Sequence, residues 1–163
     1  MADTARGLVS MTPVVTIAAD SDADAVDAIH HDIKQTLGGK LEYAKADAND
    51  KWFYSTSTDV TASHANLISG DFTESGTVAT SDDVRFLFVK NSGTTDGSTS
   101  TSAVVYVCLD AGDAAAVGDV VEIGADEAIV LKFKDGLDVA DIHAATSTGT
   151  VRCTIAAIID DVA

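Results

Sequence analysis

Two apolar runs joined by a long polar link place the strongest constraint on the fold of this chain. Residues 84–90 and 103–110 are short, rich in β-branched and aromatic residues, and bounded by turn formers, which is typical of β-strands. Neither run alternates cleanly between apolar and polar residues, so each is expected to be covered on both faces. The link, residues 91–102, is too long for a tight hairpin and too polar to be buried, so we expect an exposed loop there.

Further strands are expected at short intervals along the chain. Apolar or alternating patterns between turn residues predict strands at 13–18, 41–46, 51–57, 65–68, 117–123, 127–133 and 151–159. The last of these is the cleanest, because apolar residues occupy every second position from Val151 to Ile159. Strands at this spacing indicate a mainly β fold, namely an antiparallel β-sandwich or a jelly-roll-like fold.

One stretch has the pattern of a helix. In residues 21–37, an apolar stripe of Val26, Ile29, Ile33 and Leu37 has helical spacing, so one amphipathic helix is expected near the N-terminus. Residues 1–12 have no such pattern and are expected to form a flexible arm. With 163 residues, the remainder, residues 13–163, is long enough to form a single β-rich domain.

The charge of the chain excludes several classes of partner. Ten Lys and Arg stand against twenty-six Asp and Glu, which gives a net charge of −16. A nucleic-acid binder needs a basic patch to neutralise phosphates, and none is visible. No apolar stretch approaches the length of a membrane span, and the first residues lack the regions of a signal peptide. The sequence therefore predicts a protein that binds neither nucleic acid nor membrane and is not exported by a signal peptide.

The sequence contains no recognisable catalytic or metal-binding motif. The acidic run at 20–24 begins like a calcium loop, but Ala25 and His31 stand where an EF-hand needs Gly and Glu. His64 and His143 are expected in unrelated loops. No nucleophile elbow, phosphate-binding loop or zinc-protease motif occurs. We therefore predict no catalytic residue, no metal site and no cofactor, and a protein that is not an enzyme.

The cysteines and the aromatic cluster each have two interpretations. Cys108 and Cys153 are predicted to be small buried hydrophobic residues, although a single disulfide between them is the alternative. Trp52, Phe53 and Tyr54 concentrate much of the aromatic area. They are expected to fill the core, and an exposed platform for stacking sugars is the functional alternative.

Several segments together resemble small virion structural proteins of marine tailed phages. These segments are residues 86–97, 104–107, 121–128, 138–144 and 155–162, so the resemblance covers roughly residues 82–163. As a group, such proteins are β-sandwich components of the particle, often decoration or cement proteins on the capsid shell, and are not enzymes. The resemblance therefore implies a virion location, on the capsid exterior, with the major capsid protein and other copies of the same chain as partners.

The resemblance also leads to expectations about contacts and alternatives. A protein repeated on an icosahedral shell is expected to obey closed local symmetry, most naturally as a homotrimer. The residues predicted to contact another subunit or the capsid are Val84, Phe86, Phe88, Val105 and Val107. One alternative is a tail, neck or fibre component of the virion. Another is a carbohydrate-binding or adhesin module that uses Trp52, Phe53 and Tyr54.

Overall fold

The computed structural model describes residues 51–69, 71–72, 76–112 and 120–160. Across these residues the fold is mainly β, as predicted, with two antiparallel sheets of four strands each. A three-residue 3-10 helix, η1, spans Val139–Asp141. The predicted arm at 1–12, the helix at 21–37 and the strands at 13–18 and 41–46 lie outside the described residues.

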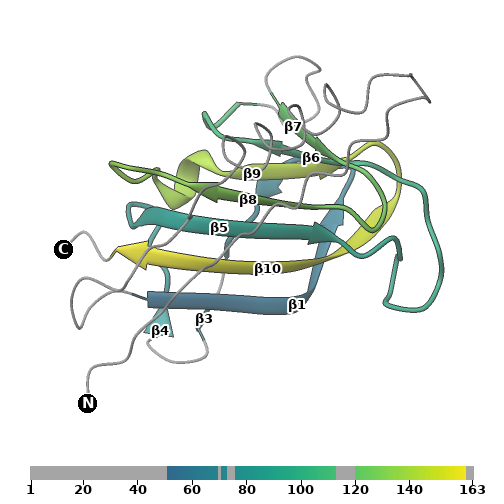
Figure 1. Cartoon of the computed structure of the whole chain (residues 1–163), viewed down its shortest axis with the longest axis horizontal. Helices are drawn as coiled ribbons and strands as arrows, with labels where there is room; N and C mark the ends of the chain where they lie inside the picture. The colour runs from purple at the N-terminus through teal and green to yellow at the C-terminus, as the bar shows by residue number, and fades with distance from the viewer. Residues whose placement is uncertain (1–50, 70, 73–75, 113–119, 161–163) are drawn as a thin grey trace, which may run out of the picture. The chain divides into compact units, whose positions relative to one another are not determined.

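The strands of each sheet come from distant parts of the chain (Figure 1). The first sheet contains, in spatial order, β1 (Lys51–Thr61), β10 (Thr150–Asp160), β5 (Asp83–Asn91) and β8 (Ala128–Lys132). The second sheet contains, again in spatial order, β2 (Ala65–Asn66), β9 (His143–Thr146), β6 (Val105–Cys108) and β7 (Val120–Ile123). A further two-stranded hairpin pairs β3 (Asp71–Phe72) with β4 (Gly76–Thr77).

The strand pairs of the two main sheets are nested within one another. β1 pairs with β10, β2 with β9, β5 with β8 and β6 with β7. Each of these pairs lies, in sequence, between the two strands of the pair named before it. Two more pairings, β5 with β10 and β6 with β9, complete the sheets. The chain therefore forms most of its strand contacts between segments that are far apart in sequence.

β10 has the alternation that its sequence predicts. Val151, Cys153, Ile155, Ala157 and Ile159 are all at most 1% exposed, and the residues between them begin as Arg152 and Thr154. Because side chains of a strand point alternately to its two faces, the first set lies on one side of the first sheet. This strand pairs with β1 on one edge and with β5 on the other, so it stands in the interior of its sheet.

One apolar core receives side chains from both four-stranded sheets. Leu87 and Ile155 of the first sheet and Val105, Val107 and Ile123 of the second belong to the same cluster of buried residues, each at most 1% exposed. Burying one such side chain stabilises the fold by roughly 1.5–3 kcal/mol. The two sheets are therefore held together mainly by apolar contacts between them.

A register shift explains why the run at 84–90 does not alternate. Ile158 pairs with Phe86 and Ile159 pairs with Val84, so Arg85 is an extra residue inserted in the ladder, as in a β-bulge. Val84 joins the core cluster together with Leu87, whereas Phe86 shares the other face of the sheet with exposed Lys132, its partner on β8. Phe86 is nevertheless only 7% exposed. The expectation that this run is covered on both faces holds at Phe86, whereas Phe88 on the same face is half-buried and Lys90 is exposed.

Some strands were missed by the sequence pattern. β3, β4 and β9 lie outside every stretch that was predicted to form a strand. Ala144 and Ala145 of β9 are buried, but such small side chains carry little of the β-branched or aromatic signal that marks a strand. Pairing with β6 fixes this strand instead.

Candidate functional site

The structure places three of the predicted contact residues inside the chain's own core. Val84, Val105 and Val107 are 0% exposed and belong to the core cluster, so they do not form a surface for another subunit or for the capsid. This corrects the prediction for these three residues, because the apolar character of both runs is used for packing the two sheets together. Phe86 is buried and Phe88 is half-buried on the opposite face of β5, and a contact through Phe88 stays a prediction.

The aromatic cluster lies in the first half of β1. Trp52, Phe53 and Tyr54 pair through their backbones with Ile158, Ala157 and Ala156 of β10. A role of these three residues in stacking sugars stays a prediction.

The loop between β5 and β6 is anchored by one buried polar residue that the sequence did not single out. Asn91 is 0% exposed. Its side-chain Nδ2 donates to the carbonyl oxygens of Ala103 (2.9 Å) and Ile123 (3.1 Å), and its Oδ1 accepts from the backbone N–H of Gly93 (2.9 Å). The sequence assigned Asn91 to an exposed link. In the structure it joins the base of the loop to β7 and fixes both ends of the loop.

The rest of this loop forms a small hairpin whose tip is organised by Asp96. Thr94 bridges to Ser100, and Gly93 and Gly97 adopt positive φ angles of 67° and 93°, which glycine tolerates best. The carboxylate of Asp96 accepts hydrogen bonds from the backbone N–H and hydroxyl groups of Ser98 and Thr99. These hydrogen bonds hold the pKa of Asp96 well below its usual value of 3.8. The backbone N–H groups of Thr99 and Ser98 contribute most to this shift. The exposed loop predicted here is therefore an ordered one.

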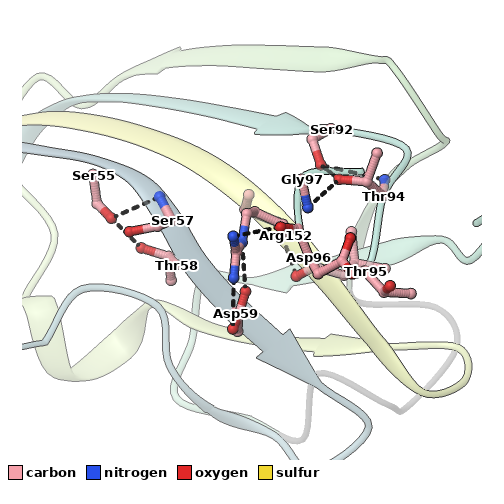
Figure 2. A network of polar contacts seen from close by, with 12 residues as sticks. Ser55, Ser57, Thr58, Asp59, Ser92, Thr94, Thr95, Asp96, Gly97 and Arg152 are labelled. Atoms are coloured by element: carbon pink, nitrogen blue, oxygen red, sulfur yellow. Dashed lines mark hydrogen bonds and ion pairs between the residues drawn. The ribbon is translucent and has the colours of Figure 1, made fainter. Parts of the chain in front are cut away.

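Arg152 connects the tip of this loop to β1 (Figure 2). Its Nε and Nη2 donate to the two carboxylate oxygens of Asp59, at 2.9 and 3.2 Å, and its Nη1 donates to the carbonyl oxygen of Asp96 at 2.6 Å. The hydrogen bond with Asp59 raises the pKa of Arg152 above its usual value. The guanidinium thus holds two segments that are far apart in sequence at a defined separation, in a fork geometry that suits arginine better than lysine.

Pairs of hydroxyl groups on β1 and on the loop belong to the same network of polar contacts. Thr58 Oγ1 donates to Ser55 Oγ at 2.8 Å, at the irregular point of the β1 ladder, and Ser92 Oγ lies 2.7 Å from Thr94 Oγ1 (Figure 2). A hollow of about 60 Å³ lies beside Asp59, and it is lined by Thr58, Thr61, Ser63 and Asn66 together with the apolar residues Val60, Ala65, Leu67 and Ala144. We call the Arg152, Asp59 and Asp96 group, with these hydroxyls, the polar junction.

The polar junction offers groups for hydrogen bonding to another surface. Its hydroxyls and its one guanidinium offer both donors and acceptors, and its small hollow encloses no substrate-sized volume. Within residues that the structure describes, no group of three His, Cys, Asp or Glu side chains is placed to hold a metal ion. The junction is therefore a candidate for recognising a polar partner, with Arg152 at its centre.

A second polar group lies where β5 and β10 meet at the other end of the ladder. The side chain of Arg85, at the bulge, is hydrogen-bonded to Asp160 (Nε to Oδ2, 3.0 Å) and lies 3.4 Å from Asp83. Burial raises the pKa of Asp83 above its usual value of 3.8, and the nearby carboxyl of Asp138 raises it further, against the attraction of Arg85. The charged form of Asp83 is therefore disfavoured in the folded protein.

Neutralising this carboxyl is expected to stabilise the protein at neutral pH. A folded-state pKa above the unfolded value means that folding takes up a proton, so the contribution of Asp83 to stability falls as pH rises through its folded pKa. Asp83→Asn removes this dependence. Thermal unfolding of the variant and the original protein is expected to coincide below about pH 4 and to diverge above it, with the variant melting higher.

Asp135→Asn provides the control for this experiment. The side chain of Asp135 is 85% exposed, so removing its charge is expected to change the melting temperature little at any pH. A melting-temperature difference between Asp83→Asn and the original protein that stays constant from pH 3 to pH 7 would contradict the assignment to Asp83.

The cysteines and two of the histidines are also placed by the structure. Cys108 and Cys153 are both buried free thiols, as predicted, and burial raises the pKa of Cys153 to about 12. His143 begins β9, and its ring centroid lies 5.0 Å from that of His64. The expectation that these histidines sit in unrelated loops is therefore wrong, because β2 and β9 pair directly beside them.

Comparisons with known proteins leave the site to be interpreted from its own geometry. Neither protein-family models, nor curated proteins, nor solved structures give a match to this chain. In the described part of the chain, no helix is both long enough and apolar enough to cross a membrane.

Proposed function

We propose that this protein is a virion structural protein that decorates the capsid exterior, where it binds the major capsid protein and other copies of itself without catalysing a reaction. The proposal starts from the resemblance of residues 82–163 to small virion proteins of tailed phages. Such a role requires a stiff β scaffold, ordered surface loops and polar groups arranged for recognition. The following observations support each of these requirements.

The order of the strands carries the proposal. One sheet runs β1-β10-β5-β8 and the other β2-β9-β6-β7, with the pairs nested first with last. We infer from this order, and from the core that both sheets share, that the two sheets stack as a jelly roll, the eight-stranded architecture found in viral capsid and lectin domains. The architecture occurs in several functional classes, so the surface has to discriminate among them.

The surface of the described region favours a recognition role. The loop at 91–102 is fixed at its base by Asn91 and at its tip by Asp96, and Arg152 ties it to Asp59. Such a loop loses little conformational entropy on binding, because it is already ordered. The net charge of −16 would keep decorated particles from adhering to one another.

A density map of particles from the phage that encodes this chain is the direct test. We expect density for the two-sheet domain on the outer surface of the shell, at a copy number comparable to that of the major capsid protein. Deleting residues 1–12 is expected to reduce occupancy if this arm binds the shell. A shell with no such density would contradict the proposal, and density confined to the tail or neck at low copy number would establish the alternative virion location.

The carbohydrate-binding alternative has one structural observation in its favour. Lectin domains also use jelly rolls, and the polar junction offers a guanidinium and hydroxyls of the kind that bind sugar hydroxyls. A glycan array with labelled protein, together with Trp52 fluorescence during sugar titration, separates the two functions. Binding that is lost in Arg152→Ala would favour a lectin role, and an array without binding would remove it.

A further inference from the structure

Among the described residues, the outer edge of β8 has main-chain hydrogen-bonding groups that no other strand pairs with. β8 is the last strand of the first sheet and pairs only with β5 among the described strands. Asn91 N–H donates to the carbonyl of Glu127, and Phe133 N–H donates to the carbonyl of Arg85. Odd-numbered residues of this strand therefore direct their main-chain groups at β5. Because these directions alternate along a strand, Ala128, Val130 and Lys132 direct theirs away from the sheet.

The same edge is apolar between charged ends of opposite sign. Ile129, Val130 and Leu131 are half-buried, whereas Leu87 on the neighbouring strand β5 is 0% exposed. Asp126 and Glu127 precede the strand, Lys132 is its last residue, and Lys134 follows it; all four are exposed. Lys132 and Lys134 make this end of the strand net positive, even with the carboxylate of Asp135 at 4.0 Å from Lys134.

We propose that β8 pairs antiparallel with β8 of a second copy, about a two-fold axis at Val130. In this register Ala128 faces Lys132 of the second copy, and the Asp126–Glu127 end of each strand lies near the Lys132 end of the other. The acidic end of each strand thus meets the basic end of the other, which a parallel arrangement would not achieve. Every outward main-chain group of β8 gains a partner, and Ile129 covers Leu131 of the second copy on the core side.

This contact goes beyond the proposed function and does not depend on it. A two-fold contact is isologous, because each copy offers the same surface, whereas the homotrimer predicted from the sequence needs a three-fold contact. A single lysine on an edge strand commonly prevents pairing with other chains. Here the acids at the other end of the strand turn the lysines into a self-complementary pattern.

A charge cycle at positions 128 and 132 tests the pairing, because both side chains are exposed. Ala128→Lys places a lysine opposite Lys132 of the second copy, twice per dimer, and is expected to weaken dimerisation about ten-fold. Lys132→Glu brings a glutamate near the acidic end of the second copy and is expected to weaken it by a similar factor. The double variant Ala128→Lys/Lys132→Glu restores opposite charges, as does a mixture of the two single variants.

Sedimentation velocity over a range of protein concentrations at fixed salt measures the dimer, and circular dichroism confirms that each variant is folded. Thr56→Glu/Thr148→Glu is the control: it changes the net charge by as much as Lys132→Glu at exposed positions outside β8, and dimerisation should be unchanged. Amide exchange gives a second readout, in which Ala128, Val130 and Lys132 become protected as concentration rises. A protein that is monomeric throughout, or dimerisation that the double variant and the mixture fail to restore, would overturn the proposal.

Discussion

Replacing Asn91 by aspartate is expected to lower the free energy of unfolding at neutral pH by about 3–5 kcal/mol. The side chain is 0% exposed, and its Nδ2 donates to two backbone carbonyl oxygens. A carboxylate cannot donate, so both carbonyls lose their partner and face a negative charge instead. Chemical denaturation monitored by circular dichroism measures the loss.

The pH dependence of this variant distinguishes the lost bonds from a general disturbance. Burial against carbonyl oxygens raises the pKa of the introduced carboxyl, so it takes up a proton as pH falls and can then donate one hydrogen bond. The deficit relative to the original protein is therefore expected to shrink between pH 7 and pH 4. Asn66→Asp, on the half-buried edge strand β2, is the matched control and should cost far less. Equal losses in the two variants would show that Asn91 does not anchor the loop.

The second large effect is expected from a cavity in the shared core. Leu87→Ala removes a side chain that is 0% exposed and packed between the sheets, so the free energy of unfolding is expected to fall by about 2–5 kcal/mol. Thermal or denaturant unfolding provides the measurement. Because Leu87 stands in the core rather than at the surface, binding to a partner should be unchanged once stability is accounted for.

Leu131 provides a matched comparison for this substitution. It is the cross-strand neighbour of Leu87, on the edge strand β8, and is only half-buried. Leu131→Ala removes the same atoms, but less of their surface is enclosed, so the loss of stability is expected to be clearly smaller at low protein concentration. A loss at Leu131 as large as at Leu87 would contradict the core described here.

The sequence predicted most strands because their signal is local. The alternation in β10 and the apolar runs of β5 and β6 give their approximate positions directly. β9 was missed because His143, Ala144, Ala145 and Thr146 carry little side-chain pattern, and its position is determined by pairing with β6. The contact role given to Val84, Val105 and Val107 was wrong, because an apolar strand has the same sequence whether it faces its own core or another molecule.

The polar junction could not be predicted from the sequence, for a different reason. Arg152 meets Asp59 and Asp96 only because the β1–β10 pairing and the hairpin at 91–102 bring them together. No spacing along the chain marks such a set. Asn91 left one weak signal, since an asparagine at the end of an apolar run followed closely by glycine is a common way to begin a turn. Its burial depends on β7, which follows it by about thirty residues.

The nested strand pairing has a consequence for synthesis on the ribosome. β1 can pair with β10 only after β10 has emerged from the ribosome, and the ladder between β5 and β10 also waits for this last strand. Contacts of such long range are slow to form, so a growing chain holds unpaired strand edges exposed for most of its translation. The many carboxylates of each chain repel those of incomplete chains on neighbouring ribosomes. This repulsion opposes association between the chains until each one has folded.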